Sequence, residues 1–368
     1  MTTETSDFHH DAAECLGVLL VNLGTPDSPG RADVRRYLKE FLWDPRVVEA
    51  PRLLWWLVLN GVILNTRPKR SAAAYAKIWT PEGSPLLAIS RRQREALQQA
   101  LTERLPGPVQ VALAMRYGRP TIAAGLDELR RAGARRVLVL PMYPQYSATT
   151  TASIFDAIGT ELRQWRWLPE LRFINQFHDD TGYIAALANS VRRHWGEHGE
   201  PQKLVMSFHG IPREYFEQGD PYHCQCQKTA RLLAEQLELA PERWLVTFQS
   251  RLGPKEWLRP YTDESLRSLA AEGVKAVDVI CPGFSADCLE TLEEVAMENR
   301  EVFIHAGGEA YGYIPCLNDL PEHIDALAEL IYTHAQGWPE TAADYDARAA
   351  AAARNARVEH ARRLGASA

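Results

Sequence analysis

Two runs of apolar residues, each closed by a Gly-x-Pro turn, mark the start of the two halves of the chain. The first covers residues 17–26 (GVLLVNLGTP) and the second covers residues 203–212 (KLVMSFHGIP). A continuous apolar run of this length, closed by a turn signal, is typical of a strand that is buried on both faces. The pattern therefore predicts that each half opens with a buried strand of a parallel sheet.

Further matches follow in the same order in both halves. Residues 115–118 resemble residues 250–253, and residues 132–143 resemble residues 272–284. Helical segments are predicted just before the second pair of matches, at residues 121–132 and 263–272. Three matches in register favour two related α/β units over the alternative that any two α/β units share strand and glycine patterns. If the halves correspond, their clefts face a shared site.

The first half contains an insertion of about 50 residues. Gly24 lies 92 residues before Arg116, but the matching Gly210 lies only 41 residues before Arg251. The surplus falls within residues 31–90 and includes the apolar segment 51–64, which is too short and interrupted to span a bilayer. We expect this segment to form a lip over an apolar cleft, in contact with a membrane surface or an apolar ligand. An ordinary buried helix is the alternative.

An acidic row follows the last matched strand of the second half. Glu290, Glu294 and Glu298 recur at every fourth position, which places them on one face of a helix. Like charges at this spacing destabilise a helix slightly. One interpretation is a solvated acidic face, which the neighbouring Glu293 favours. The other is a track of carboxylates that receives a divalent cation, because hard oxygen ligands suit such ions.

His209 ends the opening strand of the second half, between Phe208 and the Gly-x-Pro turn. Open α/β sheets bind their ligands at the carboxyl ends of their strands, so a histidine here is a candidate for chemistry. Taken alone, such a histidine is more often a core or loop residue that is hydrogen-bonded to the backbone.

Composition excludes several other classes. The chain has 368 residues, 46% of them apolar, so two domains are expected, and the net charge of −6 without a basic block argues against nucleic acid as a partner. The six cysteines are scattered along the chain, and the N-terminus lacks a signal-peptide pattern. Both features predict a cytoplasmic protein. We expect a disordered tail at residues 1–16, domains at 17–165 and 166–330, and a helical tail at 331–368.

Eight groups of segments, spread over residues 17–325, carry a resemblance to one family. They are residues 21–26 (VNLGTP), 75–78 (YAKI) with 83–85 (GSP), 114–117 (AMRY), 141–151 (PMYPQYSATTT), 207–212 (SFHGIP), 219–222 (GDPY), 248–254 (FQSRLGP) with Trp257 and 262–265 (TDES), and 282–294 (PGFSADCLETLEE). In this order they resemble the ferrochelatases, lyases that insert Fe(II) into protoporphyrin IX to form protohaem. The resemblance implies two Rossmann-like domains, each a parallel four-stranded sheet flanked by helices, with the active cleft between them.

The resemblance also implies the site. His209 and Glu290 would face each other across the porphyrin and bind ferrous iron, and Glu294 and Glu298 would continue the metal path. Lys77 lies where some relatives have an arginine near the propionates, although lysine is a point charge rather than a two-pronged donor. The remaining residues of the cleft wall would be Leu23, Arg116, Tyr117, Tyr143 and Ser147 from the first domain, and Trp257 and Phe284 from the second.

The chemistry fits these residue types. Two pyrrole protons must leave as the metal enters, so the site needs a base such as His209, and Glu290 can bind Fe(II) or accept a proton. Which of the two takes the protons stays open. The alternatives are a ferrochelatase for coproporphyrin, an enzyme of this fold that inserts cobalt into a corrin precursor, and a carrier that binds a tetrapyrrole or metal without altering it.

Cofactors and partners complete the expectation. Some relatives carry a [2Fe-2S] cluster held mainly by cysteines of a C-terminal extension. This chain has no cysteine after Cys316, and the pair Cys224 and Cys226 lacks a second close pair, so we expect no cluster and no tightly bound cofactor. The expected partners are protoporphyrin IX, ferrous iron and, through the lip, the inner face of the membrane. A monomer is expected.

Overall fold

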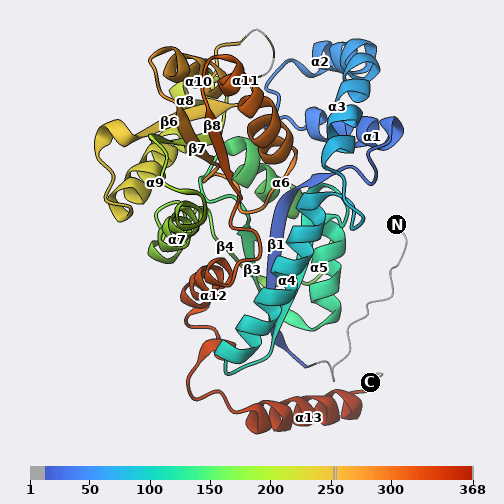
Figure 1. Ribbon diagram of the computed structural model, residues 1–368. Coiled ribbons are helices and arrows are strands. Elements are labelled where there is room, and N and C mark those ends of the chain that lie inside the picture. Colours follow the sequence, from blue (N-terminus) through green and yellow to red (C-terminus); the bar gives the residue numbers. More distant parts are fainter. Residues whose placement is uncertain (1–12, 252, 254, 367–368) are drawn as a thin grey trace.

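The computed structural model describes residues 13–251, 253 and 255–366. The described chain forms two lobes, each built on a four-stranded parallel sheet (Figure 1). The strand orders are β2-β1-β3-β4 and β6-β5-β7-β8, so the strand that opens each half is an inner strand of its sheet. The prediction of two related α/β units, each with a parallel four-stranded sheet, is confirmed.

The elements of the first lobe alternate as expected for parallel strands joined by helices. In order they are β1 (Cys15–Thr25), α1 (Arg31–Trp43), α2 (Arg52–Val58), the π-helix η1 (Leu59–Ile63), α3 (Leu64–Ile78), α4 (Pro85–Arg104), β2 (Val109–Gly118), α5 (Ile122–Arg131), β3 (Ala134–Pro141), the π-helix η2 (Ala148–Ala152), α6 (Ser153–Leu162) and β4 (Glu170–Phe173).

The second lobe repeats the pattern without the long insertion. Its elements are α7 (Thr181–His198), β5 (Lys203–His209), α8 (Arg213–Glu217), α9 (Tyr222–Gln236), the 3-10 helix η3 (Pro241–Arg243), β6 (Trp244–Gln249), α10 (Thr262–Ala271), β7 (Ala276–Ile280), the π-helix η4 (Glu290–Glu298), α11 (Asn299–His305), β8 (Ala310–Ile314), α12 (Pro321–Ala335), the 3-10 helix η5 (Pro339–Thr341) and α13 (Ala347–Arg363).

The predicted boundaries need adjustment. β1 begins at Cys15, two residues before the predicted start, and residues 1–12 of the predicted tail lie outside the described residues. β4 pairs with β3 in the first sheet, so the first domain extends past residue 165. The helices predicted at 121–132 and 263–272 are α5 and α10, each displaced by at most one residue.

The two lobes share one apolar core. A single cluster of buried side chains includes Leu16 and Leu138 from the first sheet and Leu204 and Ile280 from the second. Helix α12, which follows the second sheet, packs against both α4 and α7. Burial of apolar surface at this junction fixes the orientation of the lobes, so a site between them has a defined geometry.

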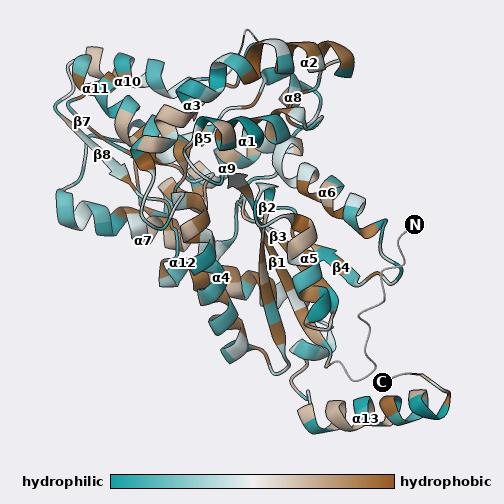
Figure 2. Ribbon diagram, turned by 90° about the vertical axis from the view of Figure 1, so that its right-hand side faces the viewer, coloured by the Kyte–Doolittle hydropathy of each residue, from teal (hydrophilic) through white to brown (hydrophobic). Residues whose placement is uncertain are grey.

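The insertion forms a cap of helices above the first sheet. Helices α1 and α3 of this insertion pack together around buried Tyr37, Leu64 and Tyr75, but α2 leaves apolar side chains on the outside. Leu53 is 78% exposed and Trp56 is 51% exposed. Figure 2 shows this hydrophobic segment at the top of the molecule. The segment therefore differs from an ordinary buried helix.

No helix in the described part of the chain has the length and apolar character needed to cross a membrane.

The close contact between β1 and β2 depends on a glycine. Gly24 has a φ of +110°, and a Cβ added there would lie 1.7 Å from the carbonyl oxygen of Tyr117. We expect Gly24→Ala to destabilise the protein by about 3 kcal/mol or more, because both the backbone conformation and the contact become unfavourable. Thermal or urea unfolding measures this.

Gly61→Ala is the matched control. Gly61 lies within the helical lip, and nothing lies within 4 Å of an added Cβ. Since alanine is favoured over glycine in helices, this variant should match or exceed the wild type in stability. Equal effects of the two substitutions would contradict the steric explanation.

Candidate functional site

His209 ends β5 in a defined hydrogen-bonded state. Its Nδ1 lies 2.6 Å from the carbonyl oxygen of Gly210, and its ring centroid lies 6.5 Å from that of Trp257. Because a carbonyl oxygen only accepts hydrogen bonds, Nδ1 carries the hydrogen. In the neutral ring Nε2 therefore keeps its lone pair, which can take a proton or bind a metal.

The backbone after His209 is held close to the neighbouring strand. The amide of Gly210 donates to the carbonyl oxygen of Gln249 at 2.7 Å, and His209 and Gln249 are paired in the β5–β6 register. A Cβ on Gly210 would lie 2.9 Å from that oxygen and 3.1 Å from the Trp257 ring. The Gly-x-Pro turn thus allows the histidine to sit against Trp257.

The acidic row lies on a π-helix, not on the regular helix that its spacing suggested. In η4 (Glu290–Glu298) each backbone hydrogen bond spans one residue more than in an α-helix. Such π-helical segments are rare overall, but those that occur are often found at functional sites. Glu290 and Glu294 are half-buried, and Glu298 is exposed. The row therefore runs from the protein interior to the surface.

Ser250 holds the middle carboxylate of the row. Its amide donates to Glu294 Oε1 at 2.8 Å, and its hydroxyl donates to Glu294 Oε2. Burial is the main cause that raises the pKa of Glu294 to about 7, and the charges of Glu290 and Glu298 add to it. Burial also raises the pKa of Glu298, and Glu293 adds to this shift. Glu294 can therefore exchange a proton near neutral pH.

Glu290 faces the first domain. After burial, the charge of Glu290 is the next cause that raises the pKa of Tyr75, and it also raises the pKa of Tyr37 and Tyr143. Burial lowers the pKa of Arg67, and the nearby Glu290 opposes that shift. The carboxylate thus lies within electrostatic range of three tyrosines and a half-buried arginine of the first domain.

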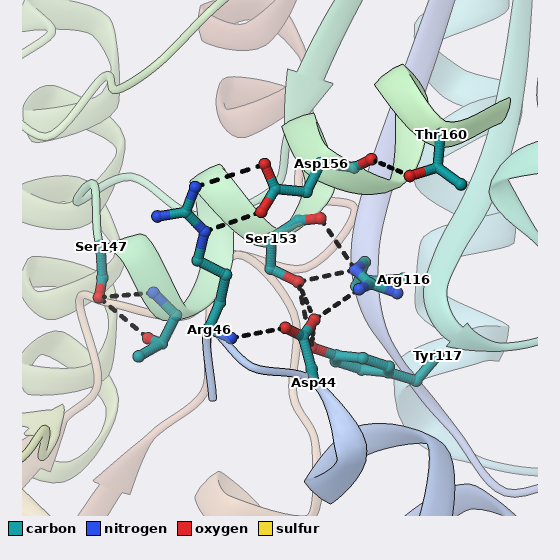
Figure 3. Close-up of polar contacts among 9 residues, drawn as sticks. Asp44, Arg46, Arg116, Tyr117, Ser147, Ser153, Asp156 and Thr160 are labelled. Carbon is teal, nitrogen blue, oxygen red and sulfur yellow. Dashed lines mark hydrogen bonds and ion pairs between the residues drawn. The ribbon is translucent and has the colours of Figure 1, made fainter. Parts of the chain in front are cut away.

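Arg116 and Tyr117 belong to a buried network centred on Asp44 (Figure 3). Oδ2 of Asp44 accepts hydrogen bonds from Arg116 Nη2 at 2.5 Å, Tyr117 Oη at 2.8 Å and Ser153 Oγ at 2.5 Å. Tyr117 is fully buried, so it supports the cleft from behind instead of lining it. Sequence reasoning missed Asp44, because an aspartate after an apolar helix looks like an ordinary helix end.

The other predicted wall residues divide into two groups. Leu23 and Phe284 come from different domains and pack against one cluster with Leu86 and Ile89, so the structure brings them together. Ser147 is buried and donates to Asp220 Oδ2 at 2.9 Å. Tyr143 packs against the core of the first domain, and its buried hydroxyl has no hydrogen-bond partner in the described structure.

Lys77 forms an ion pair with a residue beside the acidic row. Its Nζ lies 2.5 Å from Glu293 Oε1, and Glu293 is buried instead of belonging to a solvated acidic face. The pair connects α3 of the lip region to η4, because these two elements pack against each other. Lys77 therefore neutralises a buried carboxylate next to the acidic row.

The described residues hold no preformed metal site, and this includes His209 and the acidic row. Within that part of the chain no three His, Cys, Asp or Glu side chains are arranged to hold a metal ion. Cys224 is exposed and Cys226 is buried, and both are free thiols on α9. A groove of about 940 Å³ lies between α4 and α5 and contains none of the predicted site residues.

Comparison with known proteins gives one consistent result. The family model described as Ferrochelatase matches residues 15–335. The chain is 60% identical to the ferrochelatase of Thioalkalivibrio sulfidiphilus over 98% of this chain and 97% of that protein. It is 57% identical to the ferrochelatase of Azoarcus sp., with 92% of this chain and 94% of that protein covered.

Solved structures agree on the fold. SirB from Bacillus subtilis with Fe3+ superposes with a TM-score of 0.53 at 12% identity, over 90% of this chain and 100% of that chain. A likeness at this identity shows a shared two-domain fold and nothing about the substrate.

The raised pKa of Glu294 predicts a pH dependence of stability. The folded protein binds this proton more tightly than the unfolded chain, so the stabilisation is complete below the ordinary value of 4.5 and is lost as the pH rises through about 7. Between pH 5 and pH 8 the free energy of unfolding of the wild type should fall by up to about 3 kcal/mol. The free energy of unfolding of Glu294→Gln should not show this fall, because the amide does not titrate. Urea unfolding at both pH values measures the difference.

Glu272→Gln, at the exposed end of α10, controls for the removal of a carboxylate. The unfolding free energy of this variant should follow the wild type across the pH range. Parallel pH profiles for Glu294→Gln and the wild type would contradict the assignment.

Proposed function

The chain belongs to the ferrochelatase family, and we propose that it inserts ferrous iron into protoporphyrin IX with His209 and Glu290 as the reacting groups. The product is protohaem, and two pyrrole protons are released. The observation that supports this proposal best is that Glu290 on η4 lies within electrostatic range of the tyrosines of the first domain. His209 is linked to the same helix through Gln249.

His209 supplies the base. Its Nδ1 is engaged with the carbonyl oxygen of Gly210, which leaves Nε2 to accept a pyrrole proton. The neighbouring Trp257 ring, which is tilted against His209, provides an apolar surface for the macrocycle on this side. His209 then accepts the two pyrrole protons one after the other and passes each to solvent, while Glu290, on a different element, delivers the metal.

The acidic row supplies the path for iron. Fe(II) would meet exposed Glu298 first and then the half-buried carboxylates of Glu294 and Glu290. A carboxyl group with a pKa of about 7 releases its proton when a cation binds, so Glu294 can exchange a proton for the metal without strong repulsion in the empty state. The carboxylate oxygens of the row replace the water ligands of the ion as it moves toward the nitrogen atoms of the porphyrin.

The cleft wall is mainly apolar. Leu23, Phe284, Tyr143 and Trp257 are the side chains we assign to direct contact with the macrocycle. Arg116, Tyr117 and Ser147 act from behind this wall through Asp44 and Asp220. The reaction uses iron as a substrate, and we assign it no resident cofactor.

Removing either reacting group should slow iron insertion but leave porphyrin binding intact. Glu290→Gln and His209→Ala should each lower the rate of iron insertion by about 100-fold or more, because each removes a proton or metal acceptor but little apolar surface. Anaerobic incubation with Fe(II) and protoporphyrin, followed by the loss of free-base fluorescence and the shift of the Soret band, measures insertion.

Porphyrin affinity is measured in parallel by fluorescence titration. Glu272→Gln and His305→Ala, which remove the same chemical groups at exposed positions, should retain the wild-type rate. Loss of porphyrin binding in Glu290→Gln or His209→Ala would contradict the assigned roles, and porphyrin binding by a wild type that inserts no iron would favour a carrier.

The lip provides a contact with the membrane. Leu53, Leu54, Trp56 and Leu57 are exposed on α2, and exposed cationic residues follow on α3. Apolar and basic side chains on one surface favour the interface of an anionic bilayer. An apolar substrate such as protoporphyrin would enter from that interface, and this favours it over the more charged coproporphyrin.

Flotation with anionic phospholipid vesicles tests the membrane contact. Leu53→Ser with Trp56→Ser should lower the bound fraction of the protein several-fold. Leu364→Ser, which removes a side chain that is 81% exposed on the distant α13 end, should not. Equal binding of all three proteins would show that the lip is not the contact.

A further inference from the structure

Gln249 and Ser250, at the end of β6, contact the segments of the reacting groups but carry no assigned function. Gln249 is the last residue of β6, and Ser250 follows it. Gln249 is 3% exposed, so it does not contact a ligand in the cleft. Both residues nevertheless bond to the segments that carry the reacting groups.

Gln249 connects the His209 turn to the start of the acidic helix. Its backbone oxygen accepts from the amide of Gly210 at 2.7 Å, and its side-chain Nε2 donates to the carbonyl oxygen of Glu290 at 2.9 Å. Its Oε1 accepts from Ser207 Oγ at 2.6 Å, which orients the amide. A single buried residue thus bonds to both catalytic segments.

The chemistry of this position requires an amide. A glutamate would present an acceptor to the carbonyl oxygen of Glu290, and a methionine of similar size would offer no hydrogen-bond donor. The buried carbonyl oxygen would then lack this partner, and η4 would be free to shift relative to β5.

Ser250 acts on the next carboxylate. Its amide and hydroxyl both donate to Glu294, which fixes the carboxylate in one orientation. Ser250 has a φ of +66°, a conformation that non-glycine residues seldom adopt. Backbone strain of this kind persists at functional sites where the surrounding contacts enforce it.

We propose that Gln249 and Ser250 are positioning residues for metal insertion: Gln249 sets Glu290 relative to His209, and Ser250 sets Glu294 in the path of the ion. This inference rests on the proposed function. The two residues affect different kinetic constants. Gln249 acts on insertion through Glu290 and is seen in kcat, whereas Ser250 acts on metal capture through Glu294 and is seen in the KM for Fe(II).

The experiment compares Gln249→Met with Gln98→Met. Gln98 on α4 uses its amide in the same way, since Oε1 accepts from the amide of Val111 at 2.7 Å and Nε2 donates to the carbonyl oxygen of Val109 at 3.0 Å. It lies at the amino end of β2, away from the site. We expect Gln249→Met to lower kcat at least tenfold with an unchanged affinity for protoporphyrin, and Gln98→Met to keep the wild-type kcat.

Ser250 is tested with two variants. Ser250→Ala removes the hydroxyl and keeps the strained backbone, and Ser250→Gly removes the hydroxyl and relieves the strain. Both should raise the KM for Fe(II) several-fold without changing the affinity for protoporphyrin, although Ser250→Gly should unfold at a higher temperature than Ser250→Ala. If Gln249→Met fails to fold, these two variants decide the proposal.

The outcomes distinguish a failure of the positioning role from a failure of the proposed function. A kcat for Gln249→Met equal to that of the wild type, or a KM for Fe(II) that follows thermal stability across the Ser250 variants, would overturn the positioning role and leave the function intact. A wild type that inserts no iron would overturn the proposed function, and the positioning role with it.

Discussion

The site depends on keeping several carboxylates close together in a half-buried place. Like charges at successive turns repel, and burial increases the cost because it removes water. The protein offsets this in two ways: Ser250 donates two hydrogen bonds to Glu294, and Lys77 pairs with buried Glu293. A proton on Glu294 lowers the repulsion further when no cation is present. A divalent cation would therefore reduce the repulsion that remains between these carboxylates.

The duplicated fold explains why the two lobes contribute different chemistry. Both sheets have the same strand order, and His209 lies at the carboxyl end of β5, the edge at which open α/β sheets bind their ligands. The first lobe carries the insertion with its apolar lip and the Asp44 network, and the second carries His209 and the acidic helix. We therefore assign the binding surface for an apolar substrate to the first lobe, and the proton and metal ligands to the second.

Much of this was available from the sequence. The apolar runs predicted β1 and β5, and the strand order of the lobes confirms the duplication that the three matched pairs indicated. The sequence left residues 51–64 open between a lip and an ordinary buried helix, and the exposed apolar side chains of α2 favour the lip. The π-helical form of η4 was not, since a spacing of four residues fits both helix types. Asp44, the Lys77–Glu293 pair and the role of Gln249 depend on contacts between residues distant in sequence, which local patterns do not report.

The central claim is that the porphyrin lies between His209 and Glu290, and a crystal structure of the Glu290→Gln variant with free-base protoporphyrin tests it most directly. The account predicts that the macrocycle lies in the cleft between the lobes, with the His209 Nε2 facing one side of the ring and the side chain of residue 290 facing the other. A macrocycle seated on the outer surface of the lip, or one with both side chains on the same side, would contradict it.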